Sequence, residues 1–376
     1  MNTHQSLDVY KEADNVYLNI TFSTNYLQNQ GVILEYDVTK DIAVVAKGSE
    51  YYLSIIRFDV PLAEIPVALP PIVQSQPNPN LTQLIIGISY NGVNYPQNVI
   101  FQPQSLNILP PSSSIFPKYT PYYYIYEYEW MIKLINAALF ASFVASPLGS
   151  LFPGTSPPYF NFNEQTQLIE LIIPSYFKTL TSPAVAMPQI NINYPMLQFL
   201  DNFTWIRVVV GPAVINQFNL YLDVSYLSDR NGYALFGTAP VNPPSYYILQ
   251  QSSFNMQYWN PIKKLLFTCN NIPIRQEFVQ SSETNSTSPA LPIITDFTPT
   301  LENSNAGRSI AYYYPTAQYR LCDILSDSPI KKISLKVYWE DLYGNIEPMY
   351  IGSYQQANVK MLFLHKSQYK TRLNKE

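Results

Sequence analysis

Charged residues are scarce in this chain of 376 residues: they make up 13% of the sequence, about half the roughly 25% found in soluble domains. The net charge of −4 gives no overall attraction for a phosphate backbone, so we expect no sequence-specific binding of nucleic acid. The one basic cluster, with Lys366, Lys370, Arg372 and Lys375, favours a solvated or protein-contacting tail over a genome contact. Much of the surface must therefore be neutral.

Cysteine and histidine are almost absent. Cys269 and Cys322 are too few for a disulfide scaffold and lack the spacing of a zinc or redox motif, so we expect both to be buried thiols. His4 and His365 lie in no recognisable motif, which argues against a nucleophile activated by histidine.

Motifs for catalysis, cofactors or metals are also missing. The chain has neither GxGxxG nor GxxxxGK[ST], and no run of Asp, Asn and Gly resembles a calcium loop. Glu164, Glu170, Asp201 and Asp223 are of the residue type used by glycosidases, but nothing in the sequence pairs them. We therefore predict no enzyme activity, no catalytic residues, no cofactor-binding residues and no metal ligands.

Long apolar runs are absent too. The longest apolar helix candidate, residues 126–144, carries Glu127, Glu129 and Lys133, so no membrane span is predicted. The first residues have no basic region followed by an apolar one, so we expect synthesis in the cytosol without a signal peptide.

The abundant residues are tyrosine and proline, with 32 copies of each, and aromatic residues reach 15%. Tyrosine joins a large apolar body to a hydroxyl that tolerates partial exposure, which suits contacts between subunits. Alternation of apolar and polar residues predicts many short strands and an all-β fold. These strands are expected at residues 15–22, 32–38, 42–46, 51–60, 84–90, 93–101, 205–210, 218–224, 263–269, 274–279, 309–313, 333–339 and 359–364.

Proline-rich segments divide the chain. Residues 65–80 contain PVALPPIVQSQPNPN, interpreted as a linker, and PVNPPS at 240–245 marks a second interruption. One helix is expected between them, where Trp130 to Phe143 place apolar residues three and four positions apart. We predict a jelly-roll domain from residues 1–75 and 255–376, with a mostly-β domain at 76–254 inserted into it.

A family resemblance enters through the last third of the chain. The segments LLFTCNNIPIRQEF from Leu265, ITDFTP from Ile294 and YYYPTAQYRLCDILSDSPIKKISLKVYWEDLYGNIEPMYI from Tyr312 resemble penton proteins, the vertex or minor capsid proteins of Sputnik-like virophages and Polinton-like elements. The resemblance implies a single jelly-roll base with an inserted upper domain, assembled as a homopentamer at each five-fold vertex of a small icosahedral virus.

The same resemblance implies that double jelly-roll major capsid proteins surround the pentamer in a virion assembled inside the infected host cell. It carries over no catalytic residues. Binding to a ligand on the surface of a host or a giant virus is a further possibility. The alternative hypothesis is a carbohydrate- or receptor-binding β-rich module on a virion or cell surface, since exposed Tyr and Trp stack on sugars.

Overall fold

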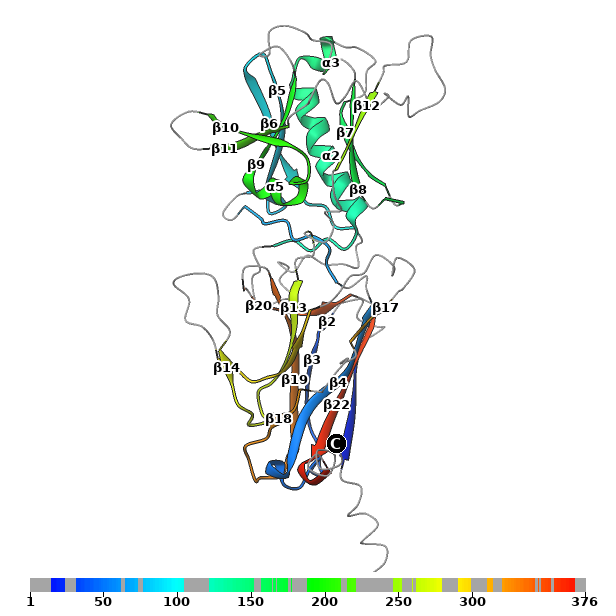
Figure 1. Cartoon of the computed structure of the whole chain (residues 1–376), viewed down its shortest axis with the longest axis vertical. Helices are drawn as coiled ribbons and strands as arrows, with labels where there is room; N and C mark the ends of the chain where they lie inside the picture. Colours follow the sequence, from blue (N-terminus) through cyan, green and yellow to red (C-terminus); the bar gives the residue numbers. More distant parts are fainter. Residues whose placement is uncertain are drawn as a thin grey trace, which may run out of the picture. The chain divides into compact units, whose positions relative to one another are not determined.

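The computed structural model forms two compact units (Figure 1). One contains the described residues of Met1–Ile65 and Ile262–Glu376, and the other those of Pro66–Gln104 and Pro110–Pro261. The second unit is thus inserted into the first along the chain. The structure describes residues 15–23, 32–61, 65–73, 77–104, 122–151, 157–163, 165–166, 168–174, 177, 188–210, 215–220, 246–251, 259, 262–278, 290–298, 310–313, 320–341, 344, 346–352 and 355–368.

The first unit is built on eight antiparallel strands in two sheets. One sheet has the order β1-β22-β4-β17 and the other β16-β13-β19, with β3 on the far side of β19. Numbered along the chain, the eight strands give the orders 1-8-3-6 and 2-7-4-5, which are the two interleaved Greek keys of a jelly roll. The strands are β1 (Asn15–Ser23), β3 (Glu35–Thr39), β4 (Tyr51–Pro61), β13 (Ile262–Cys269), β16 (Ile293–Phe297), β17 (Ile310–Tyr313), β19 (Lys332–Asp341) and β22 (Gln356–His365).

Short strands extend this framework. They pair as β2 with β21 and β14 with β15, while β18 pairs with β4 and β20 with β19. Their bounds are β2 (Val32–Ile33), β14 (Glu277–Phe278), β15 (Ala290–Leu291), β18 (Cys322–Asp323), β20 (Ile346–Pro348) and β21 (Tyr350–Ile351), and a 3₁₀ turn, η1 (Gly48–Glu50), precedes β4.

Aromatic side chains join the two sheets. Phe58 on β4 meets Phe267 on β13 edge to face, with ring centroids 5.1 Å apart, and both contact Phe297 on β16. Along β19 the alternation predicted from the sequence is confirmed, since Ile333, Leu335, Val337 and Trp339 are all buried. The core of the jelly roll therefore lies between the two sheets, as in other β-sandwiches.

The second unit packs helices against two antiparallel sheets. The larger sheet has the order β10-β11-β9-β5-β6 and the smaller β12-β8-β7. Its strands are β5 (Leu81–Tyr90), β6 (Val93–Ile100), β7 (Tyr159–Asn163), β8 (Leu168–Pro174), β9 (Gln189–Asn193), β10 (Trp205–Val210), β11 (Ile215–Leu220) and β12 (Tyr246–Gln250), and its helices are α2 (Tyr128–Ala145), α3 (Leu148–Leu151) and α5 (Tyr194–Leu200).

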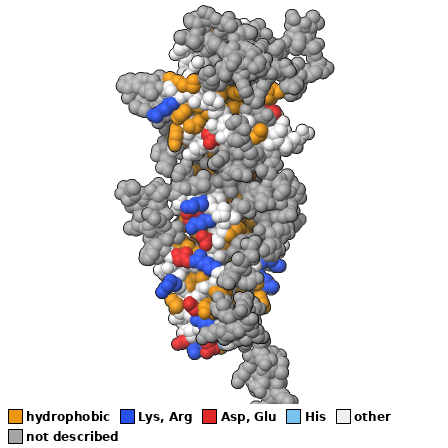
Figure 2. All heavy atoms as spheres, in the orientation of Figure 1, with side chains coloured by type: hydrophobic (Ala, Val, Ile, Leu, Met, Phe, Trp, Pro, Cys, Tyr) orange, Lys and Arg blue, Asp and Glu red, His pale blue; other side chains and the backbone are white. Residues whose placement is uncertain are grey.

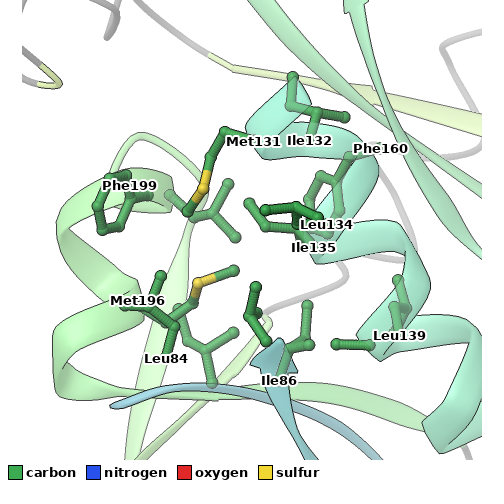
Figure 3. Close-up of a cluster of buried hydrophobic side chains, with 14 of the residues drawn as sticks. Leu84, Ile86, Met131, Ile132, Leu134, Ile135, Leu139, Phe160, Met196 and Phe199 are labelled. Atoms are coloured by element: carbon green, nitrogen blue, oxygen red, sulfur yellow. The ribbon is translucent and has the colours of Figure 1, made fainter. Parts of the chain in front are cut away.

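Helix α2 supplies most of the helical contribution to this core. Met131, Ile135 and Leu139 are fully buried and face Leu84 and Ile86 of the larger sheet (Figure 3). By length and composition alone α2 could cross a membrane, but its apolar stripe is buried against β5, β6 and β7. We read it as the core helix that the three- and four-residue spacing predicts.

Among the described residues, the short helices α3 and α5 accompany the single helix expected from the sequence. The longer of the two, α5, is capped at its N-terminus by Asn193, whose side-chain oxygen accepts a hydrogen bond from the backbone N–H of Met196 at 3.2 Å. Pro195 lies in its first turn, where a missing amide donor is harmless. With only seven residues, α5 shows too few apolar repeats for a periodicity argument.

The predicted hairpin turn at Asn91 and Gly92 is confirmed. Both residues have positive φ, 49° and 75°, as a type I′ turn requires, and they connect β5 to β6. The sequence Asn-Gly accepts this backbone cheaply, so the turn fixes the register in which Ser89 lies opposite Asn94.

Three sequence interpretations are wrong within the described residues. Residues 42–46 form no strand and contribute only an isolated bridge at Val45. The strand expected at 274–279 is reduced to an isolated bridge at Ile274 and the two-residue β14. The segment 65–73, interpreted as a linker, places Ala68 and Ile72 in the core of the second unit. Its prolines prevent regular strands but not burial. The part of the strand expected at 221–224 lies outside the described residues.

Burial of Tyr128 makes the stability of the second unit depend on pH. Its ring packs on Trp259 and Phe162, and burial raises the pKa of the Tyr128 phenol from 10 to about 12. The neutral phenol stabilises the fold fully below pH 10, and this contribution, about 2–3 kcal/mol, is lost as pH rises towards 12. In urea unfolding at pH 8 and 11.5, the wild type should lose about 2 kcal/mol more stability than Tyr128→Phe, which is most of this contribution. An equal loss in both proteins would contradict the prediction.

Candidate assembly surfaces

The carboxylates weighed for catalysis have structural roles where the structure describes them. Glu170 on β8 accepts hydrogen bonds from Asn161 at 3.4 Å and Asn163 at 2.9 Å across the β7–β8 hairpin. Asp201 ends α5 as its C-cap residue. Glu164 and Asp223 lie outside the described residues. Within the described ranges no three His, Cys, Asp or Glu side chains come together as metal ligands would.

The two cysteines are unpaired thiols. Cys269 is buried, as predicted, whereas Cys322 is only half-buried. The Cys322 thiol lies 3.1 Å from the carbonyl oxygen of Ile294, on the facing sheet. Burial raises the pKa of both thiols, so each stays protonated and weakly nucleophilic near neutral pH.

His365 belongs to a polar cluster at one end of the jelly roll. Its Nδ1 lies 2.7 Å from Ser367 Oγ, its Nε2 lies 3.8 Å from a carboxylate oxygen of Glu50, and its ring meets Tyr51 edge to face. Lys366, from the basic cluster, pairs with Asp323 at 2.8 Å. These contacts are within the chain, while His4, Lys370, Arg372 and Lys375 lie outside the described residues.

Paired charges lie on the outer face of the sheet that contains β13 and β19, beside a small apolar cluster around Leu266 and Ile293. Glu340, with a side chain only 4% exposed, lies 3.2 Å from both Lys263 and Lys264. The other pairs on this side of the sheet are Lys264–Asp296, Arg320–Asp296, Arg320–Glu277, Lys332–Asp37 and Lys336–Glu35. On the face shown in Figure 2, charged side chains of both signs gather on the jelly-roll unit. Apart from those of the buried Glu340, these pairs are exposed, and each contributes little stability, about 0–1 kcal/mol.

Exposed apolar side chains occur in both units. In the jelly roll they are Tyr17, Ile42 and Leu325, and Ile42 is 84% exposed. In the second unit they are more numerous: Val93, Ile100, Phe140, Val144, Leu151, Tyr194 and Ile206. Single exposed apolar residues are ordinary, but several on one sheet and one helix suggest contact surfaces.

Solved structures share this fold over nearly the whole chain. A chain of the Sputnik virophage, from a cryo-EM structure, matches with a TM-score of 0.73 at 29% identity, covering 95% of this chain and 99% of the other. The crystal structure of the mavirus penton protein matches with a TM-score of 0.59 at 14% identity, covering 93% and 99%. The second match shows the fold alone.

Two curated Sputnik virophage proteins each match about half of this chain. Structural protein V19 is 28% identical over 212 residues, which is 55% of this chain and 94% of V19. Uncharacterized protein V18 is 35% identical over 166 residues, which is 41% of this chain and 98% of V18.

A jelly roll with an inserted unit, surfaces suited to contact and relatives from a virion define a structural protein of a viral capsid. The family described as Sputnik minor capsid protein V18/19 matches residues 16–365, and the chain belongs to this family. The family resemblance noted in the sequence is thereby confirmed, and the chain is placed in the virion as a capsid component. The relatives whose role is named are structural or capsid proteins, which points away from an enzyme, and the comparisons do not favour a carbohydrate- or receptor-binding module.

Proposed function

We propose that this protein forms the homopentameric capsomers at the five-fold vertices of a small icosahedral capsid, where each capsomer contacts the surrounding double jelly-roll major capsid protein. The observation that carries the proposal is the jelly roll with its insertion between β4 and β13, in an arrangement similar over 93% of the chain to the mavirus penton protein. A penton occupies the vertex, so the fold and the family together support this position.

The proposal treats the two compact units as separate domains, a jelly-roll base and an inserted upper domain. From the sequence, the boundaries were predicted near residues 75 and 254, and the compact units change at 65 and 261. Each unit has its own buried aromatic and aliphatic core, which is the physical requirement for a domain.

The native mass of the purified protein tests the pentamer. Five copies of a 43.0 kDa chain give about 215 kDa, and we expect this species in native mass spectrometry over a range of concentrations and salt levels. Addition of the major capsid protein should then yield larger assemblies containing five copies per vertex. A chain that stays monomeric both alone and with the major capsid protein would refute the proposal.

A further inference from the structure

The outer face of the larger sheet of the second unit carries no charge among its described residues. Core side chains such as Ile86, Ile88, Ile190 and Ile192 define the inner face, so their sequence neighbours point outward. Register then places amides, Ser89 and aliphatic residues on the outer face, from Ile206 on β10 to Ile100 on β6. This contrasts with the ion-paired outer face of the jelly roll.

Amide side chains on this outer face form one continuous hydrogen-bonded chain. Asn191 donates to Ser89 Oγ at 2.8 Å and to Asn94 Oδ1 at 2.9 Å, and Asn94 donates to Gln217 at 3.2 Å. Gln217 donates to Asn219 at 2.9 Å, and Asn219 donates to Gln189 at 2.7 Å. The chain crosses β5, β6, β9 and β11, so it holds these side chains in fixed positions without a counter-charge.

Gly87 makes room for this chain at its centre. A Cβ atom at this position would lie 2.9 Å from Asn191 Oδ1 and 3.0 Å from the Cα of Pro96 on the neighbouring strand. Only glycine therefore allows the amides to lie this close to β5.

A second neutral surface lies on α2. The C-terminal half of the helix exposes Ala137, Phe140, Ala141, Val144 and Ala145, with Phe140 and Val144 exposed by 53% and 64%. Since the buried side of α2 covers the inner face of the larger sheet, its exposed side points away from that sheet. The unit thus presents two different uncharged surfaces in different directions.

We propose that these two surfaces bind each other in neighbouring copies of this chain, with the amide face of one subunit against the exposed C-terminal half of α2 in the next. This inference rests on the proposed pentamer, because a ring with a five-fold axis needs two different patches on every subunit. Neither patch contains Lys or Arg among its described residues, because Lys133 lies one turn before the α2 patch and Arg207 lies on the opposite side of β10 from Ile206. Loss of charge is typical of the centre of a protein interface, whereas a nucleic acid or an anionic membrane would need cations.

The size of the sheet face agrees with a subunit contact. Five strands about 4.8 Å apart, with about six residues each at 3.3 Å, span roughly 480 Å². A stable interface buries about 800 Å² on each partner, so this face would provide more than half of the area that one partner needs.

Introduced charge tests the contact. Ile206, 49% exposed on the amide face, and Val144 on α2 tolerate polar replacement in a free subunit, but Ile206→Lys or Val144→Glu would bury an unpaired charge at every interface of a ring. In native mass spectrometry and analytical ultracentrifugation, each variant should need at least about tenfold more protein to form pentamers. Ile206→Gln, which adds no charge, and Gln165→Lys, on the exposed β7–β8 turn, should assemble as the wild type does.

Thermal unfolding of each variant, followed by circular dichroism, must match that of Gln165→Lys, so that misfolding does not imitate lost assembly. Pentamers of Ile206→Lys and Val144→Glu at wild-type concentrations would overturn the inference and leave the pentamer itself intact. Intact pentamers that no longer join the major capsid protein would also overturn it, by assigning the surfaces to that partner. A wild type that forms no pentamer, either alone or with the major capsid protein, refutes the proposed function instead.

Discussion

Replacing Phe267 with alanine should lower the free energy of unfolding of the jelly roll by about 3–5 kcal/mol. Phe267 is fully buried on β13 and contacts Phe58 on the facing sheet and Phe297 on its own sheet. Its removal leaves a cavity that neither sheet can close without losing its register. Since a domain is typically stable by about 5–15 kcal/mol, the loss should be visible in urea unfolding and in yield at 37 °C.

The control for this substitution is Leu325→Ala. Leu325 is 65% exposed, so its truncation should change the free energy of unfolding by no more than about 0.5 kcal/mol. If Phe267→Ala and Leu325→Ala were equally stable, the aromatic contacts would not hold the two sheets together.

Replacing Trp259 with alanine should lower the free energy of unfolding of the second unit by a similar amount, about 3–5 kcal/mol. The indole is 3% exposed, donates a hydrogen bond to the carbonyl oxygen of Phe199 at 2.8 Å and meets the Phe199 ring edge to face at 5.3 Å. Its loss both opens a cavity and leaves a buried carbonyl without this donor. Trp259→Phe, which keeps an aromatic ring, should cost about 1–3 kcal/mol, mainly from the missing hydrogen bond.

The same two alanine variants test whether the two units are independent domains. In differential scanning calorimetry, Phe267→Ala should lower the midpoint of one transition and Trp259→Ala that of the other. A single transition that both substitutions lower equally would mean that the units unfold together, against the proposed division into a base and an inserted domain.

The sequence predicted the elements whose own pattern is strong. The alternation of ISLKVYW, the Asn91–Gly92 turn and the three- and four-residue spacing in α2 all depend on neighbours along the chain, and each is confirmed. The jelly roll followed from many short strands and a proline-bounded insertion. Its strand order, which pairs Asn15 with Leu364, depends on contacts that no local pattern reveals.

The contact surfaces were harder to predict. The segments QININ and INQFNL alternate amides with apolar residues, a signal for one polar sheet face. What the sequence lacks is the register that aligns Asn191 with Gly87 and Asn219, and hence the continuity of the uncharged face. The burial of residues 65–73 was missed for a similar reason. Frequent prolines predict that a segment lacks regular backbone hydrogen bonds, but they do not predict that its side chains are exposed.

The position of β22 constrains the order in which the two units can fold during synthesis. This strand lies between β1 and β4, so the first sheet stays split until the ribosome has passed residue 365. At about 5–20 residues per second, synthesis up to that point takes roughly 20–75 s, during which the inserted segment has already emerged and has time to fold. A chain interrupted before β22 would lack the strand that joins its N-terminal strand to the sheet. Only chains translated through β22 can therefore complete the first sheet of the jelly roll.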